Sequence, residues 1–107
     1  MTGQIPEADW KIFKELFKVT LERFCERVLL ELGPLYADTS ATHHERYLKI
    51  YGHIEKSDEA IEELFDNYRR STAWRQIAAI HRRGLFTDEE YSRFSEETHE
   101  IVALFNF

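Results

Sequence analysis

The residues of this 107-residue chain that could bind a metal or exchange protons are its five histidines and twenty carboxylates. A di-iron site in a helical bundle needs two inward-facing Glu-x-x-His pairs and two further carboxylates. Only Glu96 and His99 have this spacing, and no two histidines are four residues apart as in zinc hydrolases. His43 and His44 are adjacent, so on a helix they diverge by about 100° and cannot chelate one ion. We therefore expect no metal and no cofactor.

The one cysteine, Cys25, lies beside Phe24 and near Val28 on an apolar helix face, so we expect a buried, reduced thiol rather than a nucleophile. A single cysteine cannot form a disulfide within the chain. The sequence contains no glycine-rich phosphate loop, nucleophile elbow or dinucleotide-binding fingerprint. These observations predict a protein without enzymatic activity.

The net charge of −6 argues against nucleic-acid binding by the whole surface, but the charge is unevenly distributed. Five acidic side chains share one face of a predicted helix and form either a docking face for a basic partner or an ordinary solvated face. They are Glu55, Glu59, Glu62, Glu63 and Asp66. Five arginines follow, which could end helices, pair with acids of neighbouring helices or bind phosphates. They are Arg69, Arg70, Arg75, Arg82 and Arg83.

Apolar side chains at three- and four-residue steps predict two long helices. The first runs from about Pro6 to Leu32 and ends at the stop signal Gly33-Pro34. The second covers about residues 41–70. We expect one long helix, because the apolar phase continues through residues 56–58, and the alternative is two helices with Ser57 as a cap. We expect both apolar stripes to lie in the core. They comprise Trp10, Phe13, Phe17, Leu21, Phe24, Val28 and Leu32 in the first helix and Tyr47, Ile50, Tyr51, Ile54, Ile61, Leu64, Phe65 and Tyr68 in the second.

Shorter helices are expected after residue 70. A helix with apolar residues from Trp74 to Ile80 should end at Gly84 in the left-handed conformation, with Leu85 as the apolar contact that follows. Ser95 should start the last helix. The residues of that helix expected to close the core are Ile101, Val102, Leu104 and Phe105.

Between these helices, Thr87 and Glu90 have the spacing of a capping box, and Phe86 and Tyr91 are placed as its hydrophobic staple. The segment 76–94 resembles the short helix-hairpin motif of the SHOCT family. The matching residues are Ile77, Ile80, Gly84, Leu85, Phe86, Thr87, Glu89, Glu90 and Tyr91. The resemblance covers less than a fifth of the chain, and Ser95 interrupts the second helix where the family would continue it. It implies a helix hairpin and no function.

Together these elements predict one all-α domain over residues 1–107, a four- or five-helix bundle with two long antiparallel helices and a C-terminal helix hairpin. The predicted function is a non-enzymatic protein-interaction or regulatory module that self-associates. The alternative is a small nucleic-acid-binding regulator that uses the basic segment Arg69–Arg83. No segment has the pattern of a signal peptide or the length to cross a bilayer, which predicts a cytoplasmic protein without membrane contact.

The predicted homodimer interface is a second apolar stripe on the first helix, formed by Ile12, Val19 and Leu30. Offsets of seven and eleven residues return to within about 20° of the starting direction, so these side chains align on one line. The alternative is that the C-terminal helix covers this stripe and that the chain is monomeric.

Overall fold

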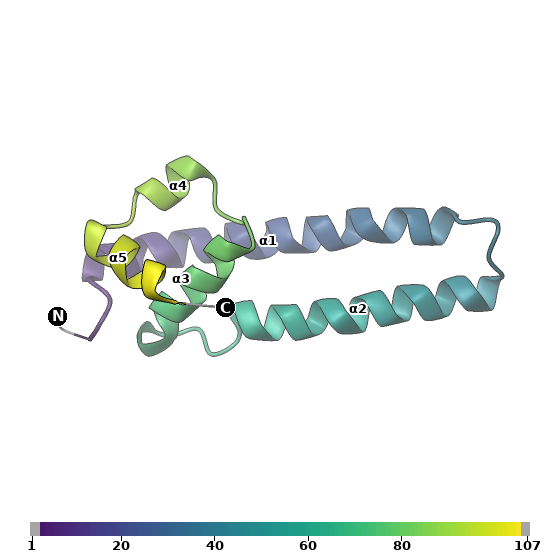
Figure 1. The fold of residues 1–107 in the computed structure, drawn as a ribbon, viewed down its shortest axis with the longest axis horizontal. Coiled ribbons are helices and arrows are strands. Elements are labelled where there is room, and N and C mark those ends of the chain that lie inside the picture. Colours follow the sequence, from purple (N-terminus) through teal and green to yellow (C-terminus); the bar gives the residue numbers. More distant parts are fainter. Residues whose placement is uncertain (1–2, 106–107) are drawn as a thin grey trace.

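The computed structural model describes residues 3–105, which form helices and no strand (Figure 1). In chain order the elements are α1 (Glu7–Ala37), α2 (His43–Phe65), a 3-10 turn (Arg70–Thr72), α3 (Ala73–Arg82), α4 (Asp88–Ser92) and α5 (Glu96–Leu104). The antiparallel helices α1 and α2 extend as a hairpin from a head built of α3, α4, α5 and the hairpin's base (Figure 1). The molecule is therefore elongated, at 56 × 23 × 21 Å. The predicted all-α architecture is confirmed.

Helix α1 continues through Gly33-Pro34, where the sequence predicted its end. Pro34 lies in the last turn of α1 and has no backbone N–H, so the helix loses one hydrogen bond there. Because the helix ends three residues later, this loss does not interrupt it. The Arg46 guanidinium donates to the carbonyl oxygen of Tyr36 at 2.6 Å and satisfies an acceptor at the helix end. The chain then turns at Asp38, whose carboxylate accepts from the N–H and the hydroxyl of Ser40. The predicted end was more than one turn too early.

Helix α2 is a single helix through Ser57, so the expected continuity is confirmed and the alternative of two helices within residues 41–70 is wrong. A capping box fixes its start: Thr42 Oγ1 accepts from the N–H of Glu45, and the Glu45 carboxylate accepts from the N–H of Thr42. The Ser57 hydroxyl instead donates to the carbonyl oxygen of His53, four residues earlier, and starts no new helix.

The end of α2 lies at Phe65 rather than near residue 70. The buried side-chain amide of Gln76, from α3, donates to the carbonyl oxygens of Leu64 and Asp66 at 3.3 and 2.7 Å. These acceptors belong to the last turn and the cap of α2, where the helix itself offers no donors. Asn67 then adopts a left-handed φ of 58°, which reverses the chain. A residue of the next helix therefore determines where α2 stops.

The predicted turn at Gly84 is confirmed. Gly84 has a φ of 68°, its N–H donates to the carbonyl oxygen of His81, and the N–H of Leu85 donates to that of Ile80. These two bonds form a Schellman motif. Leu85 is fully buried, so the apolar contact expected after the glycine is present.

The capping box at the start of α4 is also confirmed. Thr87 Oγ1 accepts from the N–H of Glu90, and the Glu90 carboxylate accepts from the N–H of Thr87. The rings of Phe86 and Tyr91 lie 6.0 Å apart across the helix start, as a hydrophobic staple requires. The C-terminal hairpin therefore forms as the local sequence predicts.

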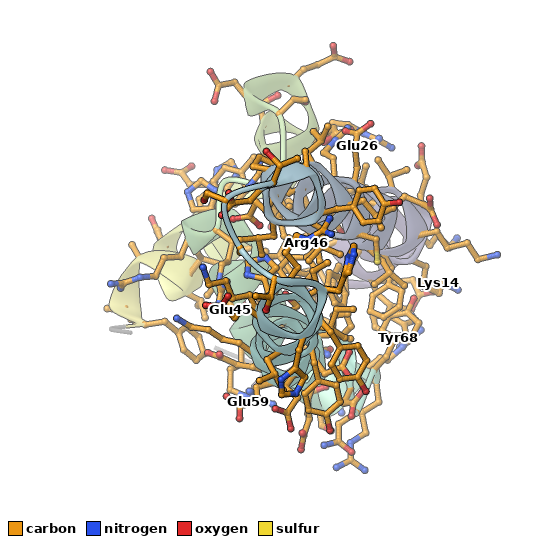
Figure 2. The ribbon with its side chains drawn as sticks, turned by 90° about the vertical axis from the view of Figure 1, so that its right-hand side faces the viewer. Lys14, Glu26, Glu45, Arg46, Glu59 and Tyr68 are labelled. Atoms are coloured by element: carbon orange, nitrogen blue, oxygen red, sulfur yellow. The ribbon has the colours of Figure 1, made fainter. Side chains whose placement is uncertain are left out.

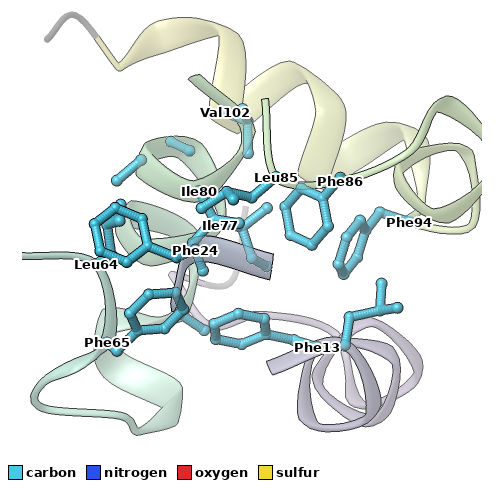
Figure 3. Close-up of a cluster of buried hydrophobic side chains, with 14 of the residues drawn as sticks. Phe13, Phe24, Leu64, Phe65, Ile77, Ile80, Leu85, Phe86, Phe94 and Val102 are labelled. Atoms are coloured by element: carbon cyan, nitrogen blue, oxygen red, sulfur yellow. The ribbon is translucent and has the colours of Figure 1, made fainter. Parts of the chain in front are cut away.

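The hydrophobic core lies in the head and at the base of the hairpin (Figure 3). Its members include Phe13, Phe24, Leu64, Phe65, Ile77, Ile80, Leu85, Phe86, Phe94 and Val102. Of the residues expected to close the core from α5, Val102 is buried, but Leu104 is 78% exposed and Phe105 is exposed at the helix end. Leu104 lies about 200° around the helix from Val102 and so faces away from α3.

A buried polar network joins the first turn of α1 to α5. The carboxylate of Asp9, which is 1% exposed, accepts hydrogen bonds from the N–H and hydroxyl of Ser95 and the hydroxyl of Thr98. Thr98 Oγ1 in turn accepts from Trp74 Nε1 of α3 at 3.0 Å. The network fixes three helices relative to one another inside the head.

Candidate interaction surface

The distal half of the α1–α2 hairpin has no core. Among the described residues, none between Phe24 and Ala60 is buried. Tyr47 and Tyr51 of α2, expected in the core, are 64% and 53% exposed, and Ile54 is exposed as well. The prediction of a continuous core stripe is wrong here because α3, α4 and α5 all lie at the base of the hairpin (Figure 1). Two helices alone cannot enclose their own apolar side chains.

Six of these side chains form what we call the tyrosine face: Leu29, Leu32 and Tyr36 from α1, and Tyr47, Tyr51 and Ile54 from α2. On α1, the first and last members, Leu29 and Tyr36, are seven residues apart, so their side chains point in directions within about 20° of each other. On α2 the three members lie within about 60° of one another. Tyr36 and Tyr47 line one shallow hollow together with Ile50, so the two helices contribute to the same side.

The view along the hairpin from its tip shows which side this is (Figure 2). Arg46 lies between the two helices, and Glu45 points to one side of them. Tyr47 is two residues beyond Glu45 and therefore about 200° away around α2. The tyrosine face is thus the opposite side, where Tyr68 and Lys14 lie at the base.

Polar groups occupy much of the seam between the distal halves of α1 and α2. His53 Nε2 lies 3.5 Å from a carboxylate oxygen of Glu31, and Arg46 donates to Tyr36 and contacts His43 Nδ1. Within the described chain, Arg46 Nε and His53 Nε2 are buried atoms without a hydrogen-bond partner. Half-buried apolar side chains such as Val28 and Ile50 share this part of the hairpin with the polar groups, so the distal hairpin has no purely apolar interior.

The stripe predicted as a dimer interface divides between the base and the shaft of α1. Ile12 is half-buried and packs against the core of the head. Val19 and Leu30 are exposed, and Leu30 points away from the tyrosine face. The three side chains therefore do not form one continuous open surface.

The predicted acidic face is exposed along the basal half of α2. Glu59, Glu62, Glu63 and Asp66 line one hollow, and Arg75 of α3 lines it with them. Glu55 lies one turn further out and does not line this hollow. The structure thus places the Arg75 guanidinium beside four of the five acidic side chains that the sequence predicted as a docking face.

The five arginines of the predicted basic segment do not gather in one place. Arg70 forms an ion pair with Glu7 at the start of α1, and Arg75 lies beside the acidic residues of α2. Arg82 and Arg83 lie at the other end of α3, a ten-residue helix about 15 Å long. The segment is continuous in sequence and divided in space.

An aromatic stack that the sequence did not indicate joins α3, α4 and α5. The Tyr91 ring lies between two imidazoles, 3.8 Å from the His81 ring and 4.6 Å from the His99 ring. His99 Nε2 lies 2.8 Å from the carbonyl oxygen of Tyr91 and donates to it. Burial, with His99 close by, lowers the pKa of His81, and burial raises the pKa of Tyr91.

The remaining candidates for chemistry are dispersed. Cys25 is half-buried rather than buried, because it lies about 100° around α1 from Phe24. His43 and His44 are exposed in the first turn of α2. Across residues 3–105, no three histidine, cysteine or carboxylate side chains come together in a group that could hold a metal ion.

Comparisons of the chain with protein-family models, with curated proteins and with solved structures found no match. In the described part of the chain, no helix combines the length and the apolar composition needed to cross a membrane.

Proposed function

We propose that this chain is a non-enzymatic protein-interaction module that binds through the tyrosine face of its hairpin. One observation carries the proposal: the large apolar side chains of this face are exposed on helices that bury no residue between positions 24 and 60. Contiguous apolar surface on a protein usually marks a site of interaction. Tyrosine suits such a site because its ring offers apolar area while its hydroxyl stays hydrated.

The other surfaces support a binding role less well. The acidic face already has Arg75 beside it, which reduces its field toward an external basic partner. Of the arginines of the nucleic-acid alternative, Arg70 is paired with Glu7 and Arg75 lies beside acidic residues of α2, which weakens the positive field that phosphate binding uses.

Affinity purification of the tagged full chain from its native host tests this proposal. The bait is compared with a Tyr47→Glu/Tyr51→Glu variant and with a Leu48→Glu control, whose exposed leucine lies on the outer side of α2. We expect proteins recovered with the wild type and the control to be lost with the double variant. Recovery of the same proteins with all three baits would show that the tyrosine face is not the binding surface.

A further inference from the structure

We propose that the occupant of the tyrosine face is a second copy of this chain, so that two hairpins pack face to face as a four-helix bundle. This inference rests on the proposed function and names the partner. A two-helix layer buries its apolar side when a second layer covers it, and a second identical hairpin supplies that layer. Because both copies use the same residues, the contact is closed by a two-fold axis and stops at a dimer.

The area of the tyrosine face matches what such a dimer needs. Its exposed members, Leu29, Tyr36, Tyr47, Tyr51 and Ile54, are 42–72% accessible. With roughly 200 Å² for a residue of this size, they offer on the order of 600 Å² of accessible surface, most of it apolar. A standard interface buries about 800 Å² on each partner, of which somewhat more than half is apolar. The face is therefore large enough to form the apolar centre of a stable interface.

The charge of the distal hairpin also permits self-association. Residues 25–59, which lie between Phe24 and Ala60, contain seven acidic and four basic side chains, but all six members of the tyrosine face are uncharged. Two copies that meet through this face therefore make their contact through uncharged side chains. A strongly basic partner would instead be attracted to the acidic residues at the base of α2.

Two adjacent leucines of α1 make a matched pair for testing the dimer. Leu29 and Leu30 are 67% and 71% exposed, but Leu29 belongs to the tyrosine face and Leu30 to the outer stripe with Val19. Light scattering coupled to gel filtration of the full chain, from low to several hundred micromolar, measures the mass. We expect a wild-type dimer whose dissociation constant rises by more than about tenfold in Leu29→Glu and stays unchanged in Leu30→Glu.

A second pair of variants, on α2, tests whether the result depends on the particular substitutions made in α1. Tyr51→Arg should weaken the dimer as Leu29→Glu does, and Leu48→Arg should leave it intact, since both side chains are about half exposed in the chain. Circular dichroism should show the same helix content for all four variants. A dimer that the Leu30 and Leu48 variants split, and the Leu29 and Tyr51 variants do not, would overturn the proposal.

A wild-type chain that stays monomeric at several hundred micromolar would also overturn it. The affinity purification then separates the two proposals. If the wild-type bait recovers a protein other than this chain and the Tyr47→Glu/Tyr51→Glu bait does not, the tyrosine face is an interaction surface whose partner is not a second copy. If the Tyr47→Glu/Tyr51→Glu bait recovers the same proteins as the wild type, both the interaction surface and the dimer are rejected.

Discussion

At the scale of single residues, Asp9 is the most constrained group of the head. Its carboxylate has lost nearly all contact with water and accepts three hydrogen bonds from Ser95 and Thr98. Hydrogen bonds to a charged acceptor contribute more than neutral ones, and donors left without it stay buried and unsatisfied. The partners of Asp9 lie more than eighty residues away in the chain, so no local sequence pattern indicates them.

We expect Asp9→Ala to lower the free energy of unfolding by about 3 kcal/mol, because it leaves the buried donors of α5 without an acceptor. Urea denaturation followed by tryptophan fluorescence measures the change. The control is Glu7→Ala in the same helix turn, which removes an exposed ion pair with Arg70 and should change stability by less than about 1 kcal/mol. Equal losses for the two variants would contradict a special role of Asp9.

A second residue-scale contact joins α1 to α4 through charge. Arg23 donates to both carboxylate oxygens of Glu90 at 2.7 and 2.9 Å, and also to the carbonyl oxygen of Leu85. The hydrogen bonds from Arg23 are the main reason that the pKa of Glu90 falls from 4.5 to about 2. Both side chains are less than one third exposed, so solvent screens the pair only in part.

This pair predicts a dependence of stability on pH. A carboxyl whose pKa is lower in the folded state stabilises the fold above its unfolded pKa, and this stabilisation is lost as pH falls toward about 2. Glu90→Gln retains the capping box but removes the charge. Between about pH 5 and pH 2, the free energy of unfolding of this variant should therefore fall by roughly 2 kcal/mol less than that of the wild type. Urea titrations at several pH values measure the free energy of unfolding of both proteins. Equal dependence on pH in the wild type and the variant would contradict the prediction.

At the scale of elements, the glycines of α2 and of the C-terminal hairpin have opposite roles. Gly52 lies in the interior of α2, where an added Cβ meets no atom within 4 Å. Gly84 also has open space around it, but its φ of +68° strains any residue with a Cβ.

We therefore expect Gly52→Ala to stabilise the chain by about 0.5–1 kcal/mol and Gly84→Ala to destabilise it by about 1 kcal/mol. Thermal melting followed by circular dichroism gives the sign of each change. Shifts of the same sign in the two variants would show that backbone conformation does not distinguish these positions.

The elements also show which parts of the fold the sequence can predict. The start of α2, the turn at Gly84 and the capping box at Thr87 depend on neighbours within a few residues, and they form as expected. The ends of α1 and α2 depend on Arg46 and Gln76, which approach from other elements. No local pattern contains that information.

The tyrosine face illustrates the same limit for the candidate site. A periodic apolar stripe indicates that one side of a helix avoids water, but it does not say what covers that side. Phe24 and Leu64 are covered by the head, whereas Tyr47 and Tyr51 continue the α2 stripe beyond it. The signal available in the sequence was the residue type, since tyrosine hydroxyls are rarely left without a partner inside a core.

At the scale of the whole molecule, stability is unevenly distributed between head and hairpin. The head and the base of the hairpin contain the buried core, whereas the distal hairpin contains half-buried side chains and a polar seam. Regions with few buried contacts open locally at low free energy and exchange their amide hydrogens quickly. In a single chain the distal hairpin should therefore open more often than α3.

Hydrogen exchange thus links the fold to the proposed dimer. At low micromolar concentration we expect the amides of residues 28–55, within the distal hairpin, to exchange faster than those of α3. At several hundred micromolar the second copy should cover the tyrosine face and slow exchange there, because binding the folded hairpin stabilises it by mass action. Leu29→Glu should abolish this concentration dependence and leave α3 unchanged, while Leu30→Glu should behave as the wild type. A distal hairpin as protected as α3 at every concentration would mean that two helices suffice to hold it, and that its exposed tyrosines have no stabilising partner in a second copy.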